Sequence, residues 1–285
     1  MNPTELVRGD VRLVSLPEVC LRIGEMVDDP NVSAGEIGHV ISQDAGLTAR
    51  LLRVVNDAGE AGSPGVETVS RAVDIIGLSG LRALVLDAFV TDAVDHIPGE
   101  LLSVSDFWRH SVYCGVLAQL LAEHCRVLHS ERLFVAGLLH DIGSLILCDR
   151  LPERMVDVYD HRDKQGVSSR VAEREVLGFD HADVGGALLE EWKVPAALRD
   201  AVSFHHSPSG AGADGLDACL VHIADALAGE AELGLNDEAR IQEIDSTAWA
   251  TSGLDPSVAQ VVLRDAGPRF SEALELVLPR AIHPN

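Results

Sequence analysis

Residues 133–148 read LFVAGLLHDIGSLILC, a largely apolar stretch in which His140 and Asp141 stand side by side. A stretch this apolar belongs in a core, and a buried charged pair needs partners because an unpaired charge is costly away from water. Neighbouring residues on a helix point about 100° apart, so both side chains reach one site only where a helix end faces it. We expect a turn at Gly143 to permit that arrangement. The pair therefore marks a candidate site within the fold.

The spacing of apolar residues elsewhere in the chain is helical. Leucine and valine recur at three- and four-residue spacings in residues 51–55, as do valine, isoleucine and leucine in residues 73–81. Ser33 and Glu36 form an S-x-x-E capping box, and Asp255-Pro256 places a cap and a first-turn proline before another helix. Stretches in which apolar and polar residues alternate, as they do in strands, are short and rare. We predict an all-α fold in which an N-terminal helical subdomain packs on a multi-helix bundle.

Glycines and histidines suggest how the chain is divided. Five glycines are expected to end helices or form tight turns: Gly77, Gly80, Gly143, Gly178 and Gly267. Nine of the twelve histidines lie between His110 and His222, after a break at His96-Ile97-Pro98-Gly99. We predict three parts, with N-terminal helices in residues 1–98, a histidine-rich bundle in 99–230 and C-terminal helices in 231–285.

The composition excludes several classes of function. The 285 residues include 45 Asp and Glu against 22 Lys and Arg, which gives a formal net charge of −23. A field of that sign repels a phosphate backbone, so no nucleic-acid partner is expected. Only Lys164 and Lys193 are available for lysine chemistry, and the chain contains no P-loop motif. The five cysteines are scattered and include no C-x-x-C pair, which predicts a reduced, cytoplasmic protein. The chain also has no run of 18 uncharged apolar residues, so we expect that it does not enter a membrane.

Histidines and aspartates on separate expected helices form the candidate site. Imidazole and carboxylate groups suit divalent cations such as Fe, Mn and Zn, and one carboxylate can bridge two ions. The candidate metal ligands are His110, His140, Asp141, His181, His205, His206 and Asp225. We therefore predict a site for one or two divalent metal ions.

These motifs resemble the HD superfamily of metal-dependent phosphohydrolases, and in particular its HDOD branch of bacterial signalling proteins. The string Leu139-His140-Asp141-Ile142-Gly143 carries the likeness, together with Trp108-Arg109-His110-Ser111 thirty residues earlier. Further similar stretches extend it over roughly residues 12–230; they are Leu16-Pro17, Ile41-Ser42-Gln43-Asp44, Leu47-Thr48, Asn56 and Ile75-Ile76-Gly77-Leu78. The resemblance implies an HD-like bundle in which the seven candidate residues hold two metals. Asp141 would bridge these metals and would be the catalytic group if the protein is active.

Two departures from the related HD-GYP phosphodiesterase branch concern contacts to substrate. Ser144 stands where that branch carries a lysine, and Ser207-Pro208-Ser209-Gly210 replaces its GYP-containing loop. A metal site can persist without the phosphodiesterase activity. We therefore predict a cytoplasmic HDOD signal-transduction module that binds metal and acts through a signalling protein partner, with a nucleotide as a candidate ligand. The alternative is a metal-dependent phosphohydrolase or phosphodiesterase acting on a nucleotide or a cyclic dinucleotide.

Four residues near the candidate site have two interpretations each. Asp106 lies four residues before His110 and could add a carboxylate to the site, although the role of a first-turn helix acid is favoured. Arg109 and Arg199 could contact a phosphate, although surface ion pairs are favoured. His222 is expected either to support the site from behind or to be exposed.

Overall fold

The computed structural model describes residues 2–9, 11, 19, 22–23, 26, 31–58, 65–91, 101–128, 130–232 and 244–277. These residues form helices and no strand, which confirms the predicted all-α class. In chain order the helices are α1 (Pro3–Leu6), α3 (Ala34–Ile41), α4 (Ala45–Ala58), α5 (Val69–Thr91), α6 (Val104–His124), α7 (Glu131–Leu139), α8 (Ile142–Arg150), α9 (Pro152–Gln165), α10 (Ser169–Leu177), α11 (His181–Glu191), α12 (Ala196–Phe204), the 3₁₀ helix η1 (Pro208–Asp214), α13 (Leu216–Glu232), α15 (Ser246–Ser252) and α16 (Val258–Val277). No described helix has both the length and the apolarity needed to cross a bilayer. The four cysteines that the structure describes are free.

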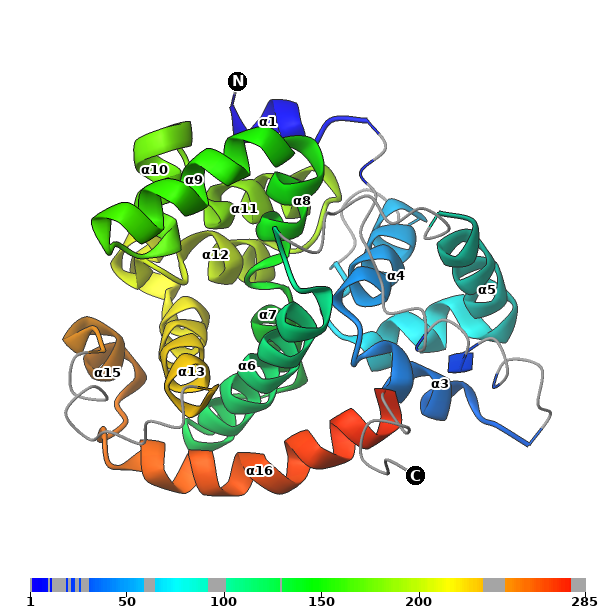
Figure 1. The fold of residues 1–285 in the computed structure, drawn as a ribbon. Coiled ribbons are helices and arrows are strands. Elements are labelled where there is room, and N and C mark those ends of the chain that lie inside the picture. The colour runs from blue at the N-terminus through cyan, green and yellow to red at the C-terminus, as the bar shows by residue number, and fades with distance from the viewer. Residues whose placement is uncertain are drawn as a thin grey trace, which may run out of the picture.

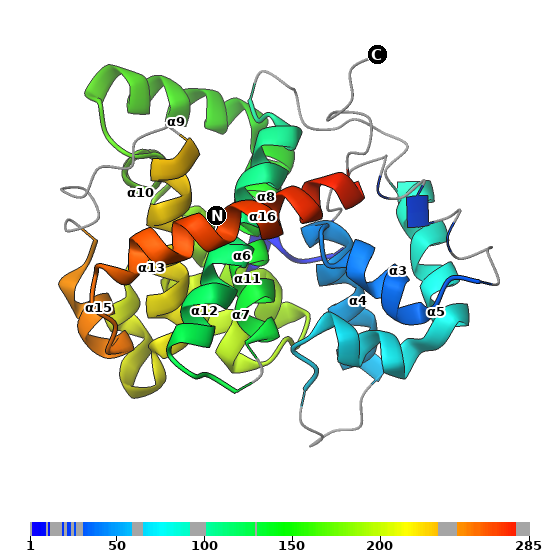
Figure 2. The same ribbon diagram turned by 90° about the horizontal axis from the view of Figure 1, so that it is seen from below.

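Two groups of helices lie side by side, as Figure 1 and Figure 2 show. Helices α3, α4 and α5 form the N-terminal group, and helices α6 to α13 form the bundle. Helix α16 lies along α6, where the rings of Tyr113 and Phe270 are 4.8 Å apart and Arg269 makes two hydrogen bonds of 3.0 Å to Glu123. The short helix α1 packs back onto α11 of the bundle. The predicted packing of an N-terminal helical subdomain on a bundle is therefore confirmed.

Two helices, α3 and α16, begin where the capping residues in the sequence predict. The Glu36 N–H donates to Ser33 Oγ at 3.2 Å, and the Ser33 N–H donates to a Glu36 carboxylate oxygen at 2.8 Å, which closes the capping box of α3. The Ser257 N–H donates to the Asp255 carboxylate at 2.9 Å immediately before α16. Each contact satisfies an N–H group that the helix itself leaves unpaired.

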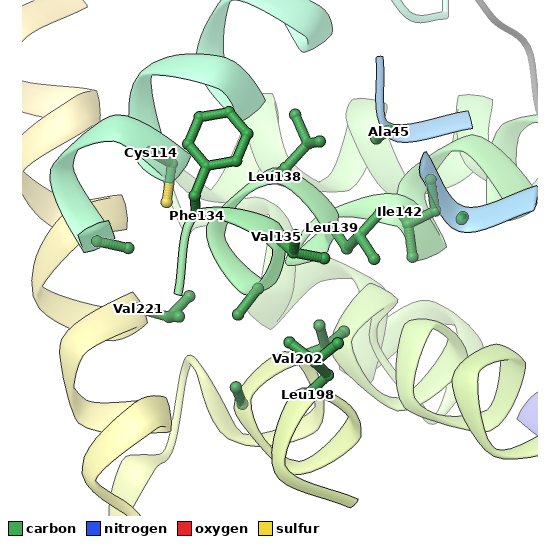
Figure 3. Close-up of a cluster of buried hydrophobic side chains, with 14 of the residues drawn as sticks. Ala45, Cys114, Phe134, Val135, Leu138, Leu139, Ile142, Leu198, Val202 and Val221 are labelled. Atoms are coloured by element: carbon green, nitrogen blue, oxygen red, sulfur yellow. The ribbon is translucent and has the colours of Figure 1, made fainter. Parts of the chain in front are cut away.

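Helix α7 is buried on every side. All of its residues from 133 to 139 are buried, so the apolar run in the sequence corresponds to a helix surrounded by protein. Figure 3 shows Phe134, Val135, Leu138 and Leu139 packed among side chains from α4, α6, α12 and α13. Burying one such side chain fully contributes about 1.5–3 kcal/mol relative to leaving it exposed. Helix α7 is therefore the centre of the core.

A pair of glycines lets α6 cross α7 closely. A Cβ atom added to Gly137 would lie 2.8 Å from the Cα of Gly115, and one added to Gly115 would lie 2.8 Å from the carbonyl oxygen of Phe134. Both distances are shorter than van der Waals contact, so larger residues would force the helices apart. The close crossing brings His110 on α6 near the C-terminal end of α7.

The predicted glycine turns are correct at two of five positions. Gly178 caps α10 with φ of 89°, and Gly77 interrupts α5 with φ of 62°. The turns predicted at Gly80, Gly143 and Gly267 are wrong, because these glycines lie inside α5, α8 and α16. A single interior glycine costs only about 1 kcal/mol relative to alanine, which is too little to end a helix that packs well.

The chain turns at His140 and Asp141 themselves rather than at Gly143. Helix α7 ends at Leu139 and α8 begins at Ile142, so the pair occupies the two-residue turn between them. Gly143 instead allows α8 to touch α11, because a Cβ atom there would lie 2.0 Å from the carbonyl oxygen of His181. Gly143 therefore allows close packing between α8, which follows Asp141, and α11, which begins at His181.

The predicted division into three parts stays a prediction. The first boundary, near residue 98, lies outside the described residues, as do Leu16-Pro17, His96, His129 and His283. The second predicted boundary, at residue 230, falls within α13, which ends at Glu232.

Replacing Gly143 with alanine should lower the free energy of unfolding by about 1–3 kcal/mol, because the added methyl group has no space between α8 and α11. Thermal unfolding followed by circular dichroism would measure the effect as a lower Tm. Gly229→Ala in α13 is the matched control, since a Cβ atom at that position meets no atom within 4 Å. The control should be neutral or stabilising by up to about 1 kcal/mol. Equal Tm values for the two variants would contradict the close contact.

Candidate metal centre

The structure brings all seven sequence-predicted ligands together in two adjoining groups. Within each group, one candidate ligand atom per residue lies within 4.8 Å of the others. The Asp141 group consists of Asp141, His181, His205 and His206, and the Asp225 group consists of His110, His140 and Asp225. The residues come from α6, the turn between α7 and α8, α11, the end of α12 and α13. Segments that are far apart in the sequence therefore converge at one place.

Asp141 faces imidazole rings from both groups. Its Oδ1 lies 3.1 Å from His181 Nε2 and 3.6 Å from His205 Nε2, both in its own group. The same oxygen lies 3.4 Å from His140 Nε2, which belongs to the Asp225 group. Asp141 is therefore placed between the two groups, as a bridging carboxylate would be.

Asp225 makes the reciprocal contacts. Its Oδ1 lies 3.2 Å from His110 Nε2 and 3.6 Å from His140 Nε2. Its Oδ2 lies 4.0 Å from Nδ1 of His206, a member of the Asp141 group. Each aspartate thus contacts its own group and one histidine of the other.

Hydrogen bonds on the far side of two rings aim their Nε2 atoms at the centre of the cluster. His140 Nδ1–H donates to the carbonyl oxygen of Gly137 at 2.7 Å, and His205 Nδ1–H donates to that of Val202 at 2.7 Å. A carbonyl oxygen only accepts hydrogen bonds, so Nδ1 carries the proton in both rings. In the neutral ring Nε2 then presents a lone pair, which is the form of imidazole that binds metals.

His181 is held by a carboxylate that the sequence analysis did not identify. Glu173 Oε2 accepts hydrogen bonds from the backbone N–H of His181 at 2.9 Å and from its Nδ1–H at 2.7 Å, and both residues are buried. A carboxylate in this position fixes the tautomer of a ligating histidine and raises its basicity. Glu173 lies on α10, across a turn from α11, and an acid on an amphipathic helix gives no sequence signal for such a contact.

The structure distinguishes the two interpretations of the neighbouring residues. His222 Nδ1–H donates to the carbonyl oxygen of His205 at 2.7 Å, so it supports the site from behind. Asp106 is exposed in the first turn of α6 and lies 3.4 Å from Arg109, which favours its role as a helix acid. Arg199 pairs with its neighbouring aspartate at 3.0 Å, as a surface ion pair.

The charges in the cluster are strongly coupled. Burial opposes ionisation of Asp141, but the attraction of His140 and His181 outweighs it and holds the pKa of the carboxyl well below its usual range. Burial likewise opposes protonation of His140 and His181, but the Asp141 charge raises the pKa of each well above the usual value. Burial and neighbouring imidazoles lower the pKa of His205 well below the usual value and that of His206 to about 4. These last two rings are therefore neutral at pH 7.

The donor set fits a divalent cation. His205 Nε2 is buried and has no hydrogen-bond partner among the described residues, although its lone pair faces Asp141. Two other nitrogens, Nε2 of His181 and Nε2 of His206, are only 2.8 Å apart. A cation held among these groups would satisfy the unpaired nitrogen of His205 and would replace the hydrogen bond between His181 and His206. Imidazole and carboxylate donors of this kind suit Fe, Mn or Zn.

A cavity of about 470 Å³ opens onto the cluster. His110, Asp141 and His181 form part of its wall, so a small molecule in the cavity would reach both groups. Arg162 also lines it, with its guanidinium carbon 5.0 Å from the centre of the Tyr159 ring. The cavity therefore presents an arginine, whose Nε donates to Asp163 at 2.8 Å, and an aromatic ring beside the candidate metal ligands.

A comparison with protein families identifies the architecture. The sequence profile of the HDOD domain matches residues 13–208, which is more than half of the chain. This chain belongs to the HDOD domain family. The resemblance seen in the sequence is therefore confirmed, and with it the interpretation of α6 to α13 as an HD-like bundle.

Two curated relatives of this HDOD protein match over parts of their length. The cyclic di-GMP phosphodiesterase CdgJ of Vibrio cholerae is 25% identical over 198 residues, which cover 60% of this chain and 44% of that protein. An uncharacterized protein of Treponema pallidum is 25% identical over 193 residues, which cover 67% of this chain and 37% of that protein. The chain therefore spans less than half the length of both relatives.

Solved structures share the fold. The MmoQ response regulator of Methylococcus capsulatus has a TM-score of 0.67 at 23% identity, covering 84% of this chain and 97% of that one. An HDOD domain protein with unknown function from Geobacter sulfurreducens has a TM-score of 0.60 at 25% identity, covering 97% of this chain and 98% of that one. The helical arrangement is thus that of known HDOD structures.

The contact between Glu173 and His181 leads to a prediction about metal affinity. Glu173→Gln keeps the shape of the side chain but removes the charge that supports His181, and should weaken Mn²⁺ binding about tenfold. Elemental analysis and calorimetric titration would measure the metal content and the Kd. Glu175→Gln, on the same helix with an exposed carboxylate, is the control and should bind as wild type does. An unchanged Kd for Glu173→Gln would refute the supporting role.

Proposed function

We propose that this HDOD protein is a cytoplasmic, metal-binding signal-transduction module that acts through a protein partner. The observation that carries the proposal is the convergence of seven histidine and aspartate ligands from the bundle helices, with the Nε2 atoms of His140 and His205 aimed inward by backbone contacts. The two groups would each hold one divalent ion, Fe, Mn or Zn, and Asp141 would contact both ions.

The position of the cluster supports a signalling role. Because its ligands come from α6, the α7–α8 turn, α11, α12 and α13, metal occupancy would tie these elements together. Without cations, these elements are joined at the cluster by hydrogen bonds such as the 2.8 Å contact between His181 Nε2 and His206 Nε2. The conformation of the bundle surface would then depend on metal occupancy, and a partner protein could recognise the occupied form. The response-regulator name of a structural relative agrees with this role but belongs to that protein.

Capture of a partner protein tests the signalling role. Wild-type protein loaded with Mn²⁺ should retain at least one specific protein from a lysate of the source organism, whereas chelated wild type and a folded Asp141→Asn variant should lose it, because the occupied conformation is the one recognised. Mass spectrometry identifies the retained protein, and His161→Ala, a change of a surface histidine, is the control. Retention that is equal in all four samples, or absent from all, would refute metal-dependent signalling.

The second candidate function is a metal-dependent phosphohydrolase. The specific observation in its favour is the cavity that joins both ligand groups to Arg162. When bound, divalent metals supply a hydroxide at neutral pH and neutralise phosphate charge. Arg162 would hold a phosphate oxygen of the substrate by charge-assisted hydrogen bonds, and the phenol of Tyr159, whose pKa burial raises, would stay protonated and able to donate. Ser144 lines the same cavity at the position where HD-GYP relatives carry a lysine.

Turnover assays test this second function. Protein loaded with Mn²⁺ or Fe²⁺ should hydrolyse a chromogenic phosphodiester, a nucleotide or a cyclic dinucleotide, and Asp141→Ala should abolish the activity because both ligand groups lose a shared carboxylate. Arg162→Ala should lower kcat/KM about tenfold through the lost charged hydrogen bond. Arg154→Ala is the control, because this arginine of the same helix donates to the Val176 carbonyl instead of lining the cavity. No turnover with any metal and substrate would exclude the enzyme.

A further inference from the structure

A second cavity lies where the N-terminal helices meet the bundle. Its volume is about 360 Å³, and its walls come from α3 and α5 on one side and from α6 and α7 on the other. This volume is within the range of about 300–1,000 Å³ that is usual for small-molecule sites. None of the seven candidate metal ligands lines it. We call it the seam cavity.

One wall of the seam cavity is apolar and closely packed. Val69, Val73 and Phe134 line it and are buried. A Cβ atom added to Gly38 would lie 2.9 Å from Val73 Cγ2, so α3 and α5 are in tight contact at this wall. The wall is therefore already formed and offers a surface for a short aliphatic chain.

Beside the apolar residues, on the same two helices, the seam cavity carries negative charge. Glu131 is fixed in place, since it accepts hydrogen bonds from the Ser70 backbone N–H at 3.1 Å and from Ser70 Oγ at 2.7 Å. The exposed carboxylate of Asp74 lines the same cavity one turn further along α5. No lysine or arginine is among the described residues that line it, and the basic side chain that does line it is the exposed imidazole of His39. A phosphate or carboxylate ligand would therefore be repelled, and a cation would be attracted.

A buried amide in the wall also lacks a donor. Gln43 is 3% exposed, and its Nε2 donates to Ser42 Oγ at 3.2 Å. Its Oε1 accepts no hydrogen bond from the described residues. An unsatisfied buried acceptor costs about 1–3 kcal/mol, so a small shift of Gln43 that let its Oε1 accept an N–H group of a ligand would be favourable. This observation is independent of the two carboxylates and points to the same chemistry.

We propose that the seam cavity binds a protonated primary amine on a short aliphatic chain. The ammonium group, with its three donors, meets the carboxylates of Asp74 and Glu131. The chain lies on the apolar wall formed by Val69, Val73 and Phe134. Metal ions fit the seam cavity less well. Among the described residues, the two sets of side chains whose ligand atoms lie close enough to share an ion are both in the metal centre. This site goes beyond the proposed function, since amine binding requires no metal.

An amine in the seam cavity would hold the N-terminal helices against the bundle. The ligand contacts Val69, Val73 and Asp74 on α5, and Glu131 and Phe134 on α7. Binding to the docked arrangement stabilises it relative to any arrangement that lacks the cavity. The small molecule would thereby control how firmly the two groups of helices are joined.

Calorimetric titration of the full chain as purified tests the proposal. n-Butylamine and 1,4-diaminobutane should bind saturably with one molecule per chain, whereas n-butanol and butyrate, which have the same chain length, should not bind. Asp74→Asn should weaken the amine about 2- to 5-fold, as expected for loss of one exposed charge pair. Gly35→Arg should weaken amine binding more than tenfold, because it places a competing cation at the cavity. The position has room for a side chain, since a Cβ atom there would meet only Ser33 Oγ, at 3.9 Å.

The control variant distinguishes the site from the general acidity of the protein. Asp157→Asn removes the same charge from an exposed position on α9 and should leave amine binding unchanged. Equal weakening by Asp74→Asn and Asp157→Asn, or amine binding without saturation, would overturn the proposal. So would binding of n-butanol or butyrate as tight as that of n-butylamine. Circular dichroism spectra that match wild type establish that each variant is folded.

Discussion

Burial of α7 is the constraint on which the rest of the structure depends. A helix that is apolar on every face cannot lie at a surface, so α4, α6, α12 and α13 have to surround it. The chain leaves this buried helix at Leu139 and turns at once, which places His140 and Asp141 at the point where several other helix ends meet. The polar cluster therefore lies at the end of the central apolar helix.

The same packing also orients the ligands. The carbonyl oxygens of Gly137 and Val202 belong to α7 and α12, near the C-terminal ends where helix carbonyls have no partner within the helix. His140 and His205 follow three residues later and satisfy them through Nδ1–H. One hydrogen bond thus completes a helix end and fixes a histidine tautomer. The backbone carbonyls at these two helix ends therefore orient His140 and His205 without further side chains.

The sequence was informative where a feature has a local signature and silent where it depends on contacts between helices. The all-α class and the capping box at Ser33 each have their own pattern and were predicted correctly. The structure places His140 and Asp141 together with the other candidate ligands, and their metal-binding role stays a prediction. Glu173 was missed because its contact with His181 depends on how α10 turns into α11. Gly143 was misread as a turn because its role is close contact between α8 and α11, and a glycine inside a helix looks the same in sequence as one at its end.

Both cavities have wall residues on α6, and α7 runs from the seam cavity to the metal ligands. Helix α7 begins at Glu131, in the wall of the seam cavity, and ends beside the metal ligands, a length of about 13 Å at 1.5 Å per residue. Its middle is closely packed apolar side chains, which resist deformation and move together. The contact of Glu131 with Ser70 at its start is exposed and polar, and such a contact costs less to break than the core. A change in how the N-terminal helices dock would therefore break this contact first and leave α7, with His140 and Asp141 at its far end, in place.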